Sequence, residues 1–120
     1  MSKSAGAVTI YHNPDCGTSR NVLAAIREAG HAPTVVEYLK TGWTQPQLTG
    51  LLKAMNARPR DLLRLRGTPA AALGLDKPAA SDAAILAAMV THPILVERPI
   101  VTSPKGVALC RPAGKVADLL

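Results

Sequence analysis

One cysteine of this chain stands where a thiol becomes reactive. Cys16 follows the short apolar run Val8–Tyr11 and precedes a stretch with helical spacing of apolar residues, so it is predicted at a helix N-terminus. The unpaired N–H groups and partial positive charge of a helix N-terminus stabilise a thiolate, and the same groups bind anions. His12 lies four residues upstream, and a protonated His12 would lower the thiol pKa further. The pattern predicts a cysteine nucleophile that faces an oxyanion.

The residues after this cysteine suit contacts with an anion. Gly17 allows the backbone to approach a ligand closely, and Thr18 and Ser19 supply small polar groups that are typical of caps and anion-binding loops. Two alternatives are a small buried hydrophobe for Cys16 and a hydrogen-bonded structural imidazole for His12. Because a polar loop before a helix is a poor place for burial, we expect reactive chemistry at Cys16. For His12 neither role is favoured.

Two arginines share a feature that places them near strand ends. Arg98 and Arg111 each precede a proline, and the residue before proline is biased towards extended conformation. Both side chains could reach a site above the sheet, although a surface salt bridge is the common alternative. If the arginines converge on a thiolate, their guanidinium groups favour an oxyanion substrate.

The second cysteine is expected to be structural. Cys110 ends a predicted core strand, which favours burial, with a role as resolving thiol as the alternative. Two cysteines far apart, without other ligands at close spacing, fit neither a disulfide framework nor a zinc site. We therefore expect two thiols and no bound metal.

Composition limits the partners. The chain has 120 residues, the usual size of one domain, and its 48% hydrophobic content predicts a folded core. A net charge of +6 favours anionic partners, from nucleic acid to a small oxyanion. Nucleic-acid binding normally shows basic residues clustered along one face or exposed aromatics, and the densest basic run here, Arg58–Arg66, is expected to leave only a short basic helix face. Residues 1–7 lack the apolar segment of a signal peptide, and no run approaches the roughly 18–20 apolar residues of a membrane span. We expect a cytoplasmic protein that binds neither nucleic acid nor membrane.

Hydrophobic spacing predicts the elements that must position these residues. A strand over Val8–Tyr11, a helix that ends at Gly30 and a strand within Pro33–Leu39 form a βαβ unit. The strands of such a unit are parallel, and its ligand site lies at the carboxyl end of the first strand. Cys16 stands at that end.

A helical insertion is expected over about residues 44–92. Three helices are predicted there, one after the capping box Thr44–Gln47, one over Pro59–Leu65 and one between Ser81 and Pro93. No helix or strand is predicted over residues 68–80. Most arginines of the basic segment Arg58–Arg66 are expected on a solvated helix face.

The C-terminal part predicts an antiparallel hairpin and a helix. Pro99–Thr102 and Val107–Cys110 flank a turn with Pro104 and Gly106 at favoured positions, and Pro112 opens a helix through Leu120. The fold class is therefore α/β, with a mixed four-stranded sheet in the order βαβ, helical insertion, ββα. We expect a single domain over residues 1–120.

Four segments together resemble the glutaredoxin-coupled arsenate reductases: Tyr11–Asn21, Leu62–Arg64, His92–Ile100 and Leu109–Pro112. The resemblance covers nearly the whole chain. It implies a thioredoxin/glutaredoxin-like fold with a helical insertion, and a cis Arg98–Pro99 peptide bond beside the cysteine loop.

The resemblance also implies a role for each candidate residue. Cys16 is the nucleophile, His12 tunes its thiolate, and the oxyanion is bound by Arg64, Arg98 and Arg111. The implied reaction reduces arsenate to arsenite through a Cys16 adduct, with glutathione as co-substrate and glutaredoxin as partner. Because the electrons come from thiols, no bound cofactor is expected.

Two other functions stay open. A stress regulator of the same superfamily, which binds RNA polymerase, would resemble a Cys-x-x-Cys switch more than this loop, in which Ser19 takes the place of the second cysteine. A glutathione-dependent thiol transferase would keep Cys16 but tolerate loss of the arginines. We favour the reductase because the thiol loop and all three arginines occur together.

Overall fold

The computed structural model describes residues 7–120, which divide into two compact units. One unit holds the described residues up to Thr41 together with Arg98–Leu120, and the other holds Gly42–Glu97. Residues 1–6, which belong to the segment without signal-peptide character, lie outside the described residues. The expectation of a single domain over 1–120 stays a prediction.

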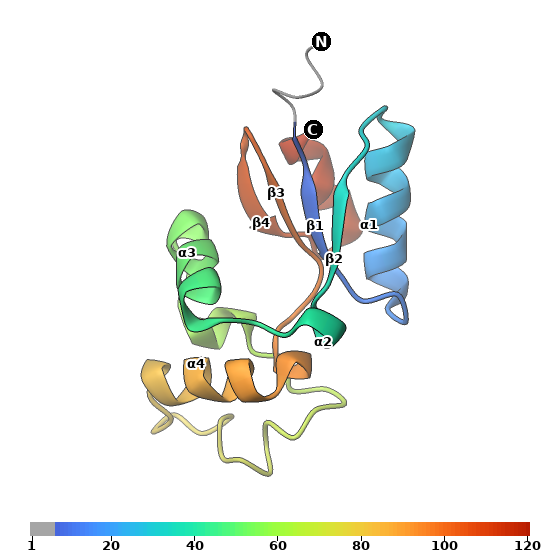
Figure 1. Ribbon diagram of the computed structural model, residues 1–120. Helices are drawn as coiled ribbons and strands as arrows, with labels where there is room; N and C mark the ends of the chain where they lie inside the picture. Colours follow the sequence, from blue (N-terminus) through green and yellow to red (C-terminus); the bar gives the residue numbers. More distant parts are fainter. Residues whose placement is uncertain (1–6) are drawn as a thin grey trace. The chain divides into compact units, whose positions relative to one another are not determined.

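The first unit is built on a mixed sheet of four short strands (Figure 1). The strands are β1 (Thr9–His12), β2 (Thr34–Glu37), β3 (Ile100–Ser103) and β4 (Gly106–Leu109), in the order β2-β1-β3-β4. β1 pairs with β2 in parallel and with β3 antiparallel, and β3 and β4 form an antiparallel hairpin. The predicted mixed sheet of four strands is confirmed.

Strand register places three segments at one edge of this sheet. Tyr11, next to the end of β1, pairs with Ile100, the first residue of β3, and Ile100 pairs with Leu109, the last residue of β4. The residues after β1, before β3 and after β4 therefore emerge at the same edge. These residues include Cys16, Arg98 and Arg111.

Helices cover one face of the sheet and close an aliphatic core. α1 (Gly17–Glu28) and η3 (Ala113–Leu119) contact each other, and their apolar side chains pack with those of the sheet. The core residues are Val8, Ile10, Val22, Ile26, Val101, Cys110, Val116 and Leu119. Val22 and Ile26 lie one helical turn apart and are fully buried, which stabilises the fold by about 1.5–3 kcal/mol for each side chain. This packing fixes α1, and with it the Cys16 loop that precedes it.

The short helix α2 (Tyr38–Thr41), which was not predicted, ends this part of the chain.

The second unit is helical. Its elements are α3 (Gln45–Met55), η1 (Pro59–Leu62), α4 (Asp82–Thr91) and η2 (Pro93–Leu95). The predicted capping box is present, because the Thr44 hydroxyl accepts from the Gln47 N–H at 3.2 Å and the Gln47 side chain accepts from the Thr44 N–H at 3.3 Å. α4 begins with a Ser81 cap, as predicted, and contacts α3, η1 and η2.

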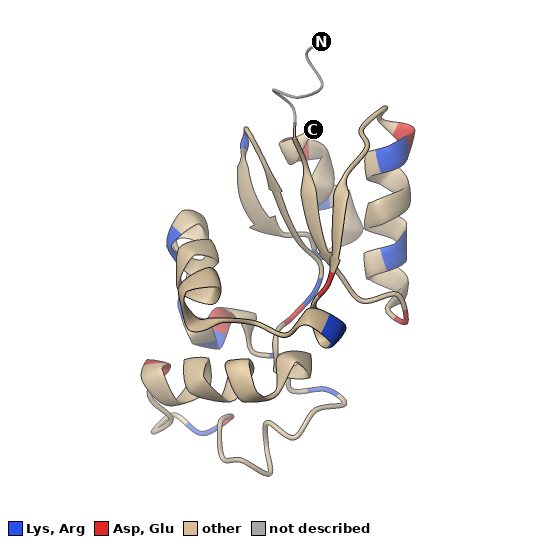
Figure 2. Cartoon of the chain, viewed as in Figure 1, with Lys and Arg blue, Asp and Glu red and all other residues tan. Residues whose placement is uncertain are grey.

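The helix predicted within residues 58–66 is wrong, and one of the arginines there binds other segments. The helix expected over Pro59–Leu65 ends at Leu62 as a 3₁₀ helix, because Leu63 is extended and forms an antiparallel bridge with Val96. Arg60 is only partly exposed, and its guanidinium donates to the carbonyls of Leu75, Lys77 and Ala80 at 3.5, 3.1 and 2.8 Å. The segment between η1 and α4 is thus hydrogen-bonded to η1. Elsewhere, Lys and Arg residues are spread over the elements of each unit (Figure 2).

The C-terminal helix is present but has 3₁₀ geometry over Ala113–Leu119. The Arg98–Pro99 peptide bond is cis, as the resemblance implied, and the Arg111–Pro112 bond is cis as well.

Candidate active site

Backbone hydrogen bonds hold the cysteine loop in place. The Cys16 N–H donates to the Asn13 carbonyl at 3.0 Å, and the Asp15 N–H donates to the Asn13 side chain at 3.0 Å. Arg20 closes the loop from α1, because its guanidinium donates to the Pro14 carbonyl at 2.8 Å. Cys16 is therefore held as the N-cap of α1, in extended conformation. The predicted position at a helix N-terminus is confirmed.

The Cys16 thiol is poised to ionise near neutral pH. Burial raises its pKa, but hydrogen bonds from Arg98, from the Ser19 backbone and from Arg111, with the charge of Arg98, lower the pKa from 9.0 to about 7. The expectation that this loop disfavours burial is wrong, since Cys16 is only 8% exposed. Cys16 is buried and its thiolate is nevertheless stabilised, because the positively charged arginine side chains replace the stabilisation that water gives an exposed thiolate.

Arg98 and Arg111 lie together with this sulfur. Nη1 of Arg111 lies 3.7 Å from Cys16 Sγ and donates to the Arg98 carbonyl at 2.9 Å. Arg98 is 9% exposed, and its buried Nε and Nη1 have no hydrogen-bond partner among residues 7–120. A buried cation with unused donors is costly unless an anion binds it. The two arginines and the thiol therefore form a site that suits an oxyanion.

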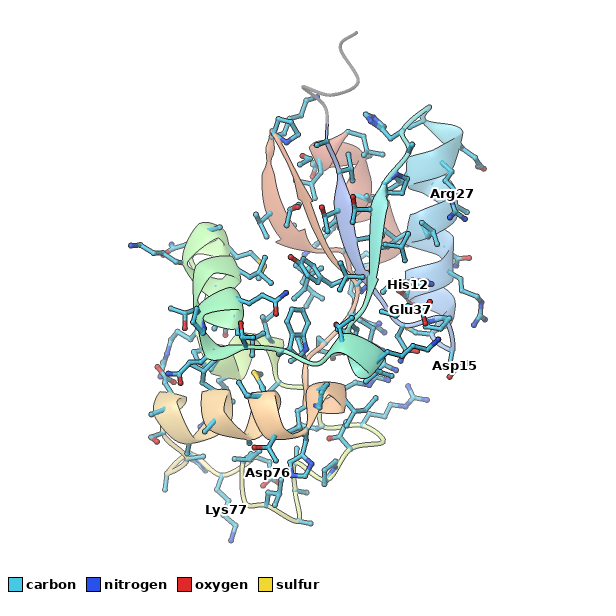
Figure 3. All side chains as sticks on the ribbon, viewed as in Figure 1. His12, Asp15, Arg27, Glu37, Asp76 and Lys77 are labelled. Atoms are coloured by element: carbon cyan, nitrogen blue, oxygen red, sulfur yellow. The ribbon has the colours of Figure 1, made fainter. Side chains whose placement is uncertain are left out.

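The buried His12 side chain contacts α1 through Ser19. Its Nδ1 lies 2.6 Å from the hydroxyl of Ser19, which also accepts from the Asn13 N–H at 3.1 Å. Burial lowers the pKa of His12, Arg27 and Arg20 lower it further, and the neighbouring Glu37 opposes them (Figure 3). The charge of His12 is not among the causes that lower the Cys16 pKa. A role of His12 in tuning the thiolate stays a prediction.

The three small residues of the loop differ in what they offer a ligand. Ser19 donates its backbone N–H to Cys16, whereas its fully buried hydroxyl is occupied by His12 and Asn13. Thr18 is half-buried at the first turn of α1. A Cβ on Gly17 would meet only the Arg20 side chain, at 3.7 Å, which is an ordinary contact. Substrate contacts by Gly17, Thr18 and Ser19 stay predictions.

Arg64 belongs to the second unit, and there it is held by a carboxylate. Its Nη1 donates to Glu97 Oε1 at 2.8 Å and its Nε donates to the Arg66 carbonyl at 3.1 Å. Glu97 was not a candidate from the sequence. Its position directly before Arg98 was the available signal.

Cys110 is buried, as predicted. Its side chain is fully buried, its sulfur donates to the Ala108 carbonyl at 3.8 Å, and burial raises its pKa to about 11. Both cysteines are free thiols. The pKa of Cys16 is therefore lowered from 9.0, whereas the pKa of Cys110 is raised from the same value.

This difference predicts selective alkylation. At pH 7–8 iodoacetamide is expected to modify Cys16 well before Cys110, because the thiolate is the nucleophile and only Cys16 ionises in that range. The Cys16 rate is expected to rise with pH through a midpoint of about 7, measured by mass spectrometry of the alkylated peptides. A midpoint at about 8.5, the value of an ordinary free thiol, would show that the arginines do not stabilise the thiolate.

A metal-ion cluster and a membrane-spanning helix are both absent from the part of the chain that is described. Within residues 7–120, no group of three or more His, Cys, Asp or Glu side chains could hold a metal ion. Across the same residues, every helix is too short or too polar to cross a membrane.

Comparison with known proteins gives consistent matches. The model of the ArsC family matches residues 11–119. An arsenate reductase of Synechocystis sp. is 59% identical over 113 residues, which are 94% of this chain and 81% of that protein, and the arsenate reductase of Escherichia coli K12 is 45% identical over 94% of this chain and 80% of its own. Among solved structures, an arsenate reductase from Vibrio cholerae superposes with a TM-score of 0.90 at 37% identity, covering 97% of this chain and 99% of that one.

Proposed function

The chain belongs to the ArsC family, and from this membership and the geometry around Cys16 we propose that it is an arsenate reductase. The observation that carries the proposal is the thiol with a pKa of about 7 beside Arg98, whose buried Nε and Nη1 are unused within residues 7–120. A thiolate repels an anionic substrate, and the arginine charges offset that repulsion. Thiolate and oxyanion can then meet at one site.

The first step joins sulfur to arsenic. Cys16 Sγ attacks the arsenic(V) atom, an S–As bond forms, and one arsenate oxygen leaves as water after protonation. Arg98 and Arg111 bind the remaining oxygens and stabilise the negative charge that they carry. The backbone N–H groups at the start of α1 add donors to the same anion. Arg64 is proposed as the third arginine of this set, on the basis of the family resemblance.

The later steps use external thiols. The glutathione thiolate attacks Cys16 Sγ of the adduct, a disulfide between Cys16 and glutathione forms, and the S–As bond breaks. The electron pair of that bond stays on arsenic, which is thereby reduced from arsenic(V) to arsenic(III) and leaves as arsenite after protonation. A glutaredoxin thiolate then attacks the glutathione sulfur, takes up the glutathionyl group and releases the Cys16 thiolate. Because this cycle needs a reduced glutathione pool, we propose that the protein works in the cytoplasm.

The test is an assay of arsenate-dependent NADPH oxidation with glutathione, glutaredoxin and glutathione reductase. We expect turnover that requires arsenate, glutathione and glutaredoxin together. Turnover without glutaredoxin would contradict the proposed recycling step. Thiol transfer to a small disulfide in the absence of arsenate turnover would instead favour the thiol transferase.

Replacing Cys110 with serine is expected to leave kcat within about threefold of the wild type, because one thiol and one external reductant suffice for the cycle. Its burial and raised pKa also keep Cys110 protonated at neutral pH. The measurement is the same coupled assay, with thermal unfolding as a control for the fold. Loss of turnover in a folded Cys110→Ser protein would assign this thiol a redox role.

A further inference from the structure

The guanidinium of Arg20 lies beside the Cys16 loop, within the first unit. Its Nη1 donates to the Pro14 carbonyl at 2.8 Å, and its Nη2 lies 3.7 Å from the position that a Cβ on Gly17 would occupy. The side chain therefore folds back along the first turn of α1. It places Nη2 next to the residue that directly follows Cys16.

This guanidinium keeps an unneutralised charge and unused donors. Arg20 is exposed and forms no ion pair within residues 7–120, not even with the exposed Asp15 of the same loop. Its Nε and Nη2 make no hydrogen bond with the same residues. Apart from the two neighbours of Gly17, no other side chain of the described residues lies within 4 Å of the Cβ position beside Nη2. An anion can therefore reach Nη2 without displacing another side chain there.

The bond to Pro14 prepares Arg20 to bind a ligand. A mobile arginine side chain loses conformational entropy on binding, whereas a guanidinium already fixed at Nη1 loses less. The other arginine of α1, Arg27, stands in the last turn of the helix, and its side chain makes no hydrogen bond or ion pair within residues 7–120. Of the two, only Arg20 is held next to the cysteine loop.

The proposed reaction brings a second anion to this place. Glutathione must reach Cys16 Sγ, and it attacks as a thiolate that also carries two carboxylates and one ammonium group. Because the adduct is itself anionic, a positive charge beside Cys16 favours this approach. Arg98 and Arg111 are occupied by the arsenate oxygens in the proposed first step. Arg20 is the arginine of the first unit that stays available beside the cysteine loop.

We propose that Arg20 binds a carboxylate of glutathione and thereby directs the thiol onto Cys16, as a specificity-determining residue for the reductant. This inference rests on the proposed function, in which glutathione attacks the Cys16 adduct. Arg20 acts on the reductant and not on arsenate, so its removal affects the two substrates differently.

The first test measures KM for glutathione and for arsenate in the coupled assay. Arg20→Ala is expected to raise KM for glutathione about fivefold, which is the upper range for an exposed ion pair, and to leave KM for arsenate within about twofold. The difference from the wild type should shrink as ionic strength rises, because salt screens exposed charges. Arg27→Ala, at an exposed arginine of the same helix, is the matched control and is expected to leave both KM values unchanged.

The second test needs no arsenate. The Cys16 thiolate attacks one sulfur of glutathione disulfide, a disulfide between Cys16 and glutathione forms, and a glutathione thiolate leaves. Arg20→Ala is expected to slow this reaction about fivefold, as followed by mass spectrometry, and to leave the reaction with neutral 2-hydroxyethyl disulfide within about twofold. Arg20→Gln keeps a side-chain donor for the Pro14 carbonyl but removes the charge, and it is expected to behave like Arg20→Ala.

The failures are distinguishable. If Arg20→Ala slows the reactions with both disulfides equally, or shifts the pH midpoint of Cys16 alkylation, Arg20 acts by holding the loop and the inference is overturned. Wild-type behaviour of Arg20→Gln, or of Arg20→Ala, would overturn it as well. If the wild type does not turn over arsenate but Arg20→Ala still slows the reaction with glutathione disulfide alone, the proposed function fails and the contact with glutathione stands.

Discussion

Replacing Cys16 with serine is expected to abolish arsenate-dependent turnover, by on the order of 10³-fold or more, in a protein that stays folded. A serine hydroxyl does not ionise near neutral pH, so neither the S–As bond nor the later disulfide with glutathione can form. The loop should survive the change, because the bonds that shape it are made by the Cys16 backbone N–H and by Asn13.

The coupled assay checks this result, with Cys110→Ser as the matched cysteine control. Circular dichroism and thermal unfolding establish that the Cys16→Ser protein is folded. Turnover within tenfold of the wild type would show that Cys16 is not the nucleophile. If the folded wild type itself shows no arsenate turnover while the coupling enzymes work, the regulator or the thiol transferase becomes the better proposal.

Replacing Arg98 with alanine is expected to lower kcat/KM for arsenate by about 10²–10³-fold, which is the usual effect of removing one donor that stabilises a developing anion. Arg98 contributes twice, because its unused Nε and Nη1 are available to the oxyanion and its hydrogen bond and charge lower the pKa of Cys16. The alkylation midpoint of Cys16 is therefore expected to move above about 7 in the same variant.

Arg98→Lys separates the two contributions. A lysine keeps a positive charge near the thiol, so much of the pKa shift of Cys16 should remain, but an ammonium lacks the planar fork that binds two oxygens. We expect a near-normal alkylation profile with poor arsenate turnover. Arg58→Ala, at an exposed arginine in the other unit, is the control and should change neither measurement. Unchanged kcat/KM in Arg98→Ala would contradict the proposed role of this arginine in binding the oxyanion.

Much of the fold was predictable because its signals are local. The capping box at Thr44, the cap at Ser81 and the turn between β3 and β4 each depend on residues within a few positions of one another. The 3₁₀ helix that stops at Leu62 was missed, because Leu63 pairs with Val96, far along the chain. The carbonyls that Arg60 binds are likewise 15 to 20 residues away.

For the site, the sequence by itself determined where the proposed nucleophile stands, because a polar loop between a strand and a helix places Cys16 at a helix N-terminus whatever packs around it. Only the tertiary structure decided the acidity of Cys16, the lowered pKa of His12, the hydrogen bonds of the Ser19 hydroxyl and the Arg64–Glu97 pair. Those properties depend on burial and on charges that strand register brings together. Electrostatic interactions change steeply with distance and solvent exposure, and neither quantity is written in the spacing of residues along a chain.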